Sequence, residues 1–319
     1  MRLTLHFALL AACVGCGQVD DAGSGGAAGS GGIGHIDAGT GGVAGTIAGA
    51  GPGGGGGEPA LPICGVPVRE HSDVGSVTLA VKSVRIPTGA GFDLDCCDGG
   101  ECTTACPSPP DAANGVDNAF AGPIRELLLS VDAGVPDPNE EANFAIGAGE
   151  WTWILELDGA AHQMRVTQGS RQGNSPTWTG SEEWSRQGQS GWVEAMELDS
   201  GWFNVEPLVL HLPLDAEHLG VKLEIVLAHV LVSHELGSWR ATLGGQLDPG
   251  VLDATIYNLL ANGDPKQCPN IPQSISLQYF DVGLSGSRCS RVSFGANLEL
   301  GVVRVAGDEP LSISPGVCF

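Results

Sequence analysis

The segment GFDLDCCDGGECTTACPSPP, from Gly91 to Pro110, concentrates side chains that form disulfides or bind metal ions. Its four cysteines are Cys96, Cys97, Cys102 and Cys106. The spacing CC-x4-C-x3-C differs from the paired C-x2-C knuckles of structural zinc sites. In an exported chain, cysteines meet an oxidising compartment and pair by default. The segment therefore predicts a loop pinned by disulfides.

The acidic residues of the same segment allow a second interpretation. They are spaced D-x-D-x-x-D-G-G-E, in the style of a calcium-binding loop. An EF-hand loop would need an oxygen ligand where Cys97 stands, a glycine one place before Gly99, and an acid at its twelfth position. A returning segment would have to complete the oxygen shell. The alternatives are thus a plain acidic loop or a calcium site made by Asp93, Asp95, Asp98, Glu101, Asp117 and Asn118.

The remaining cysteines favour four disulfides in one domain. Of the ten cysteines, Cys13 and Cys16 lie near the start, which leaves eight. An even number in an exported domain suits full pairing. We expect Cys268 to pair with Cys289, and Cys64 with Cys318, because domain termini often lie close together. The cysteines concerned are Cys64, Cys96, Cys97, Cys102, Cys106, Cys268, Cys289 and Cys318.

The N-terminus predicts an exported lipoprotein. Met1-Arg2 and the apolar run LTLHFALLAA form a signal peptide too short to span a bilayer. LAAC matches a lipobox, so residues 1–12 would be cleaved and Cys13 lipidated, with Cys16 as the alternative. Residues 13–57 are dominated by glycine, whose ordering costs too much entropy for a fold without large side chains. We expect them to form a flexible tether, followed by one domain over residues 58–319.

The net charge of −23 narrows the range of partners. Such a field repels phosphate backbones, which excludes nucleic-acid binding as a main role. No later stretch is apolar and long enough to span a bilayer. We therefore expect contact with the membrane through the lipid anchor alone.

The pattern of apolar residues predicts an all-β domain. Alternation with a period of two residues marks strands. A phase shift in Val221–Leu236 indicates a bulge or full burial. One helix is expected after the N-cap Asp248, ending at Asn262-Gly263, and a second short helix after Asn114. We expect an antiparallel β-sandwich of the jelly-roll type, stabilised by disulfides. The predicted strands are residues 76–86, 150–159, 207–214, 221–236 and 289–303.

The layout of the whole chain resembles a known group of proteins. LAAC, the irregular GG-x-AG tether, GFDLD and NGVDNAF (Asn114–Phe120) resemble segments of the uncharacterised surface lipoproteins of myxobacteria and their relatives. The resemblance implies a location at the outer membrane or cell surface. It implies no reaction.

A cluster of tryptophans suggests a binding function. Trp178, Trp184 and Trp192 lie in a polar, turn-rich segment, where exposed indoles stack on sugar rings. The alternative is that they cover a sheet edge. We expect a non-catalytic module that binds a glycan or another envelope component.

A hydrolase of the glycosidase type, with an unrecognised site, is the alternative function. Glu197 and Asp199 share a strand face, but Trp202 stands where a familiar pattern has a third acid. His229 and His234 are five residues apart on a strand, so they point to opposite faces and cannot share one metal. We assign no catalytic residue and no certain cofactor.

Overall fold

The computed structural model describes residues 75–94, 116–130, 137–171, 175–188, 190–198, 201–215, 221–261, 282 and 290–310. All of these residues fall within the unit Glu58–Phe319. Most of them lie in β-strands. The strands are β1 (Val77–Arg85), β2 (Thr152–Asp158), β3 (Gln163–Ser170), β4 (Glu183–Gln187), β5 (Val193–Leu198), β6 (Gly201–Asn204), β7 (Leu208–Asp215), β8 (Val221–Glu235), β9 (Ser238–Leu247), β10 (Val292–Val302) and β11 (Arg304–Glu309).

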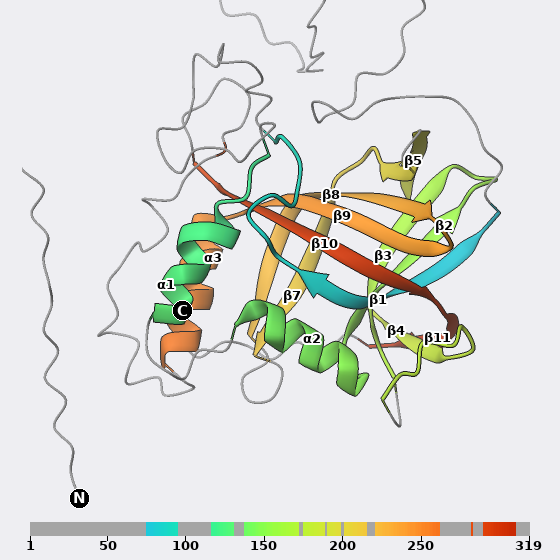
Figure 1. Ribbon diagram of the computed structural model, residues 1–319, viewed down its shortest axis with the longest axis horizontal. Helices are drawn as coiled ribbons and strands as arrows, with labels where there is room; N and C mark the ends of the chain where they lie inside the picture. Colours follow the sequence, from blue (N-terminus) through green and yellow to red (C-terminus); the bar gives the residue numbers. More distant parts are fainter. Residues whose placement is uncertain are drawn as a thin grey trace, which may run out of the picture. The chain divides into compact units, whose positions relative to one another are not determined.

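Eight of these strands close into an antiparallel barrel (Figure 1). Their order is β3-β2-β1-β10-β9-β8-β6-β5, and β5 pairs with β3 again to complete the ring. The closing pairs are Gln163 with Glu194 and Met164 with Val193. The expected jelly-roll sandwich is therefore wrong, because one closed sheet takes the place of two packed sheets.

The physical reason for this error is that a sandwich and a barrel share the same strand pattern. In both folds, alternate side chains enter the core, so a period of two residues identifies a strand and not its closure. Closure here depends on the short strands β5 and β6, of which the sequence indicated only a strand face at Glu197 and Asp199. Their pairing with β3 and β8 joins residues that are distant in the sequence.

β10 shows how the sequence pattern builds the barrel wall. Phe294, Leu298 and Leu300 are buried in the interior cluster, whereas Asn297 and Glu299 between them are exposed. The pattern changes at Gly295, where the carbonyl of Ala90 crosses so closely that a Cβ would lie 2.0 Å from its oxygen. The outer face of β10 is therefore covered at one end and open at the other.

The predicted phase shift in β8 is a bulge. The pairing of β8 with β9 changes register between Val226 and His229, and Leu227 has a φ of 49°. Before this bulge β8 pairs with β7, and after it with β6. The bulge thus lets one long strand serve two neighbours on the same side.

Helices pack on the barrel wall. The predicted helix after Asp248 is confirmed as α3 (Pro249–Ala261), which contacts β8 and is capped by Asp248 Oδ1 accepting from Gly250 N at 2.9 Å. The expected second helix follows a π-helical turn (Phe120–Ile124) as α1 (Arg125–Ser130). An unexpected helix, α2 (Pro138–Ala148), lies against β1 and β7 (Figure 1). No helix among the described residues is long and apolar enough to span a membrane.

Two side-chain amides of α2 bind the edge of β1. β2 pairs with β1 only as far as Ala80. Beyond that point, Asn143 Oδ1 accepts from Val84 N and its Nδ2 donates to Val84 O, both at 2.9 Å. Asn139 Oδ1 accepts from Ile86 N at 2.9 Å. These bonds satisfy backbone groups that no strand reaches.

A smaller apolar cluster lies outside the barrel. Ala80 and Ile154, on the outer faces of β1 and β2, pack against the buried Trp184 of β4 and Val303. β4 pairs with β3 and, in parallel, with β11. The outer layer made by β4 and β11 therefore covers one part of the wall and leaves the neighbouring part exposed.

Candidate ligand-binding site

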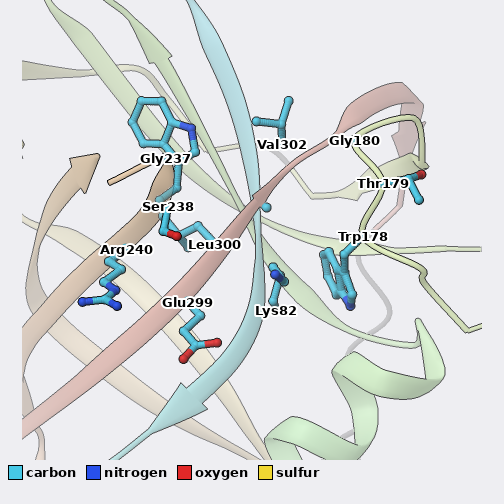
Figure 2. Close-up of a pocket in the computed structure, with 12 residues that line it drawn as sticks. Lys82, Trp178, Thr179, Gly180, Gly237, Ser238, Arg240, Glu299, Leu300 and Val302 are labelled. Carbon is cyan, nitrogen blue, oxygen red and sulfur yellow. The ribbon is translucent and has the colours of Figure 1, made fainter. Parts of the chain in front are cut away.

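A pocket lies on the wall of the barrel beside this outer layer. Its volume is about 380 Å³, within the range of small-molecule sites, which is about 300–1,000 Å³. β1, β9 and β10 form its floor, and two turns form its sides (Figure 2). We call it the Trp178 pocket. Its lining residues are Lys82, Trp178, Thr179, Gly180, Gly237, Ser238, Trp239, Arg240, Glu299, Leu300, Gly301 and Val302.

A buried carboxylate fixes the turn that carries Trp178. Glu182 is 4% exposed. Its Oε1 accepts from Thr177 Oγ1 at 2.7 Å and Thr179 N at 2.8 Å, and its Oε2 accepts from Gly180 N at 2.9 Å. Burial alone raises the pKa of this carboxyl, but the hydrogen bonds from Thr179, Thr177 and Gly180 outweigh burial and lower the pKa to about 2. The turn is therefore organised around a charge.

The backbone of Trp178 is held in a left-handed conformation, with a φ of 58°. A residue with a Cβ adopts this region at a cost of roughly 1–2 kcal/mol. Its indole stacks on that of Trp184, with 5.7 Å between centroids and 24° between planes. Because Trp184 is fully buried, it supports Trp178 from behind. Trp178 is thus set in place by its turn before any ligand arrives.

The floor of the pocket includes a glycine on which two side chains pack closely. A Cβ on Gly301 would lie 3.0 Å from Lys82 Cδ and 3.2 Å from Trp178 Cε3. Lys82 and Trp178 therefore both pack over the bare backbone of Gly301. In Figure 2 the side chain of Lys82 lies beside the Trp178 ring. The stem of Lys82 and the edge of the Trp178 ring thus lie over the same glycine.

The opposite side of the pocket is the hairpin between β8 and β9. Its two turn residues, Leu236 and Gly237, have φ values of 50° and 79°, as in a type I′ turn. Trp239 follows it and stacks on His234, with 4.4 Å between centroids. Trp239 also packs partly against the interior cluster, which steadies it. Trp239 pairs in register with Leu300, whose side chain lies in the interior cluster, so its indole lies on the inner face of the wall, opposite to the face that carries Arg240 and Glu299.

The charged groups of the pocket lie in a row across three strands. Arg240 of β9 is paired in register with Glu299 of β10, and Lys82 lies on β1. Figure 2 shows Glu299 between Arg240 and Lys82. Glu299 also approaches Arg85, at 3.7 Å and with both side chains exposed. Neither Lys82 nor Arg240 forms an ion pair within the described part of the chain.

The three tryptophans expected to bind a ligand have different positions. Trp178 lines the pocket, and Trp184 is buried behind it without an exposed face. Trp192 lies outside the pocket, 40% exposed, with the guanidinium of Arg165 4.5 Å from its ring centroid. The sequence reasoning missed Trp239. Gly237 between two apolar runs was a weak signal, because Leu236-Gly237 is not one of the dipeptides typical of a two-residue hairpin.

The acidic residues proposed as calcium ligands fall partly outside the described residues, where Asp95, Asp98 and Glu101 lie. Asp93 and Asp117 are buried, and Asp117 Oδ2 accepts from Leu94 N at 2.6 Å. Within the ranges described, no group of three or more side chains suited to a metal ion occurs. The calcium site stays a prediction.

Asn118, the sixth of those residues, binds backbone. Its Nδ2 donates to the carbonyl oxygens of Pro87, Ala90 and Gly295, each at 2.9 Å. Its Oδ1 accepts from Gly295 N at 3.0 Å. The carboxamide thus joins the segment after β1 to the outer face of β10. All ten cysteines, and with them the lipidation and disulfide predictions, lie outside the described residues.

The residues considered for catalysis do not meet in the pocket. Glu197 lies on β5, and Asp199 is outside the described residues. His229 is buried and stacks on Phe203, with 5.3 Å between centroids, and its desolvation lowers its pKa. His234 stacks on Trp239 instead. Comparison with known families, with curated proteins and with solved structures finds no match for this chain.

Proposed function

We propose that the barrel is a non-catalytic module that binds carbohydrate in the Trp178 pocket. The observation that carries this proposal is the position of Trp178. Its indole is supported by Trp184 and held by Glu182 in a strained backbone conformation at the side of a polar pocket. Strain kept in place by buried hydrogen bonds is typical of functional sites. The wall of the barrel does not itself require the backbone strain at Trp178.

The chemistry of the pocket suits a sugar ring. An indole offers an apolar face to the C–H groups of a ring. The polar groups around it, from Thr179, Ser238 and Glu299, match the hydroxyl groups at the ring edge. Glycoside hydrolysis by the usual route needs two carboxyl groups across the bond. Among the described lining residues Glu299 alone carries a carboxylate, so the proposal is one of binding.

A glycan array probed with the purified full-length protein tests this function. We expect binding to a subset of glycans, and about a fivefold or greater loss of affinity in Trp178→Ala, since stacking on an aromatic ring contributes on the order of 1 kcal/mol or more. Trp192→Ala is the matched control, because it removes another exposed indole outside the pocket. Unchanged binding by both Trp178→Ala and Trp239→Ala would contradict the proposal.

We further propose that a lipid at Cys13 and the tether of residues 13–57 hold the barrel at the outer membrane or cell surface. The LAAC motif and the glycine-rich composition support this location. Cell fractionation with lipid labelling tests it. The double variant Cys13→Ala plus Cys16→Ala should lose both label and membrane association, while Cys16→Ala alone should keep them. A labelled, membrane-bound double variant would remove the anchor from the proposal.

A further inference from the structure

We infer that the Trp178 pocket selects sugars that carry a carboxylate, the uronic acids. This inference rests on the proposed function, because it specifies which carbohydrates the same pocket takes. Two cations, Lys82 and Arg240, line the pocket beside a single carboxylate, Glu299. The chain as a whole has the opposite balance, with 14 Lys and Arg against 37 Asp and Glu. The pocket is thus a local positive site on an acidic protein.

The two cations of the pocket outnumber its one carboxylate, which also approaches a third cation, Arg85, outside the pocket. Glu299 lies 3.7 Å from Arg85. For Lys82 and Arg240, the described residues provide no carboxylate within ion-pair distance. A cation that is left free at a pocket wall pairs readily with a ligand anion, and hydrogen bonds of this charged type are about twice as strong as neutral ones.

The position of Lys82 indicates where on the sugar the carboxylate would have to be attached. The stem of Lys82 and the ring of Trp178 pack over the same glycine, Gly301. A sugar ring stacked on Trp178 therefore brings its ring substituents close to the Lys82 ammonium. A carboxylate attached directly to the ring, as in a uronic acid, meets the cation without losing the stacking contact. A neutral hexose fills the same place with a hydroxymethyl group and gains no ion pair.

The net charge of the protein makes this local arrangement necessary. With −23 overall, the protein repels anionic polymers at long range. A uronate polymer binds only where local cations overcome that repulsion. Salt then has two opposing effects, because it screens the long-range repulsion and the short-range pairing. The acid form of the ligand and its neutral ester separate these effects from the stacking contribution.

The test compares oligomers of galacturonate, glucuronate and mannuronate with their methyl esters, by isothermal titration with the full-length protein. Esterification removes the charge and keeps the ring. We expect at least one acid to bind about tenfold more tightly than its ester, in line with a charge-assisted hydrogen bond. In Lys82→Met this preference should fall to near unity while weak ring binding persists. Arg304→Gln, an exposed cation of β11 outside the pocket, is the control.

The outcomes separate this inference from the function on which it rests. If every ester binds as tightly as its acid, or if only neutral glycans bind on the array, the inference is overturned and carbohydrate binding stands. If no glycan of either kind binds the wild-type protein, both fail. A preference for acid that survives in Lys82→Met and in Arg240→Met would also overturn it, because the selectivity would then arise elsewhere.

Discussion

Trp178 and Trp192 come from one polar, turn-rich stretch, yet the fold uses them differently. Trp178 belongs to a turn organised by the buried carboxylate of Glu182, and its ring rests on Trp184. Trp192 is more exposed and contacts the guanidinium of Arg165, which also binds Glu156 at 2.6 Å. The difference shows that exposure alone does not make an indole a binding group. Trp178 differs because its backbone is held in a strained left-handed conformation by a turn that buries a carboxylate.

The largest change in stability is expected when the charge of Glu182, which holds the turn of Trp178, is removed. In Glu182→Gln, an amide group faces hydrogen-bond donors that a carboxylate had satisfied, so the free energy of unfolding should fall by about 2–3 kcal/mol. Urea unfolding at neutral pH measures it. Glu183→Gln changes the exposed neighbour on β4 and should shift stability by less than about 0.5 kcal/mol. Equal effects of the two changes would show that the turn does not depend on this charge.

The same carboxylate predicts a pH dependence. The pKa of Glu182 is about 2 in the folded protein, below the ordinary value of 4.5. Its contribution is therefore fully present above pH 4.5 and is lost as the pH falls towards 2. Unfolding measured between pH 5 and pH 2 should show a smaller loss of stability in Glu182→Gln than in the wild-type protein. Parallel pH curves for the two proteins would contradict this assignment.

Gly301→Ala tests whether the close packing of Lys82 and Trp178 matters for glycan binding. The added methyl group forces Lys82 and Trp178 apart by a few tenths of an ångström, because both side chains lie within 3.2 Å of its position. We expect glycan affinity to fall about tenfold, with a stability loss of roughly 1 kcal/mol. Gly307→Ala on β11 is matched, since nothing lies within 4 Å of its Cβ position. Affinity unchanged in Gly301→Ala would mean that the ligand does not use this floor.

The smallest effect is expected at Trp192. Trp192→Ala removes a cation–π contact at a partly exposed site, which contributes about 0.5–1 kcal/mol. The free energy of unfolding should fall by about that amount, and glycan affinity should not change. Thermal unfolding together with the binding assay measures both quantities. A loss of binding at Trp192 would move the ligand site away from the Trp178 pocket.

The strands could be predicted because each one carries its own pattern. Leu298, Glu299 and Leu300 in β10 alternate as buried, exposed and buried, which is the expected period of two. The barrel could not be predicted, because closure depends on contacts such as Met164 with Val193 that no local pattern encodes. α2 was missed although its signals were present. Asp137 is an N-cap before Pro138, and Gly149 ends the helix with a φ of 80°.

The pocket was less predictable than the strands. Trp178 and Trp184 share the same polar sequence context, yet Trp178 lines the pocket and Trp184 belongs to a buried apolar cluster. Lys82 stands in a strand where the alternation breaks between Val81 and Ser83, and a broken alternation indicates a bulge without indicating its purpose. The meeting of Lys82, Trp178 and Gly301 follows from the pairing of β1 with β10 and from the turn at Glu182. Neither is visible in one local segment.

The carboxamide of Asn143 gives the protein protection against self-association. It accepts from Val84 N and donates to Val84 O, the two bonds that a residue of a neighbouring antiparallel strand would make. A strand edge that keeps those groups open is a template on which a second molecule adds its own strand, the first step towards aggregates. α2 therefore covers the edge where another strand could pair. Because α2 is a helix, it offers no open strand edge to which a further strand could add. At high concentration, copies of the protein would therefore not pair strand to strand at this edge.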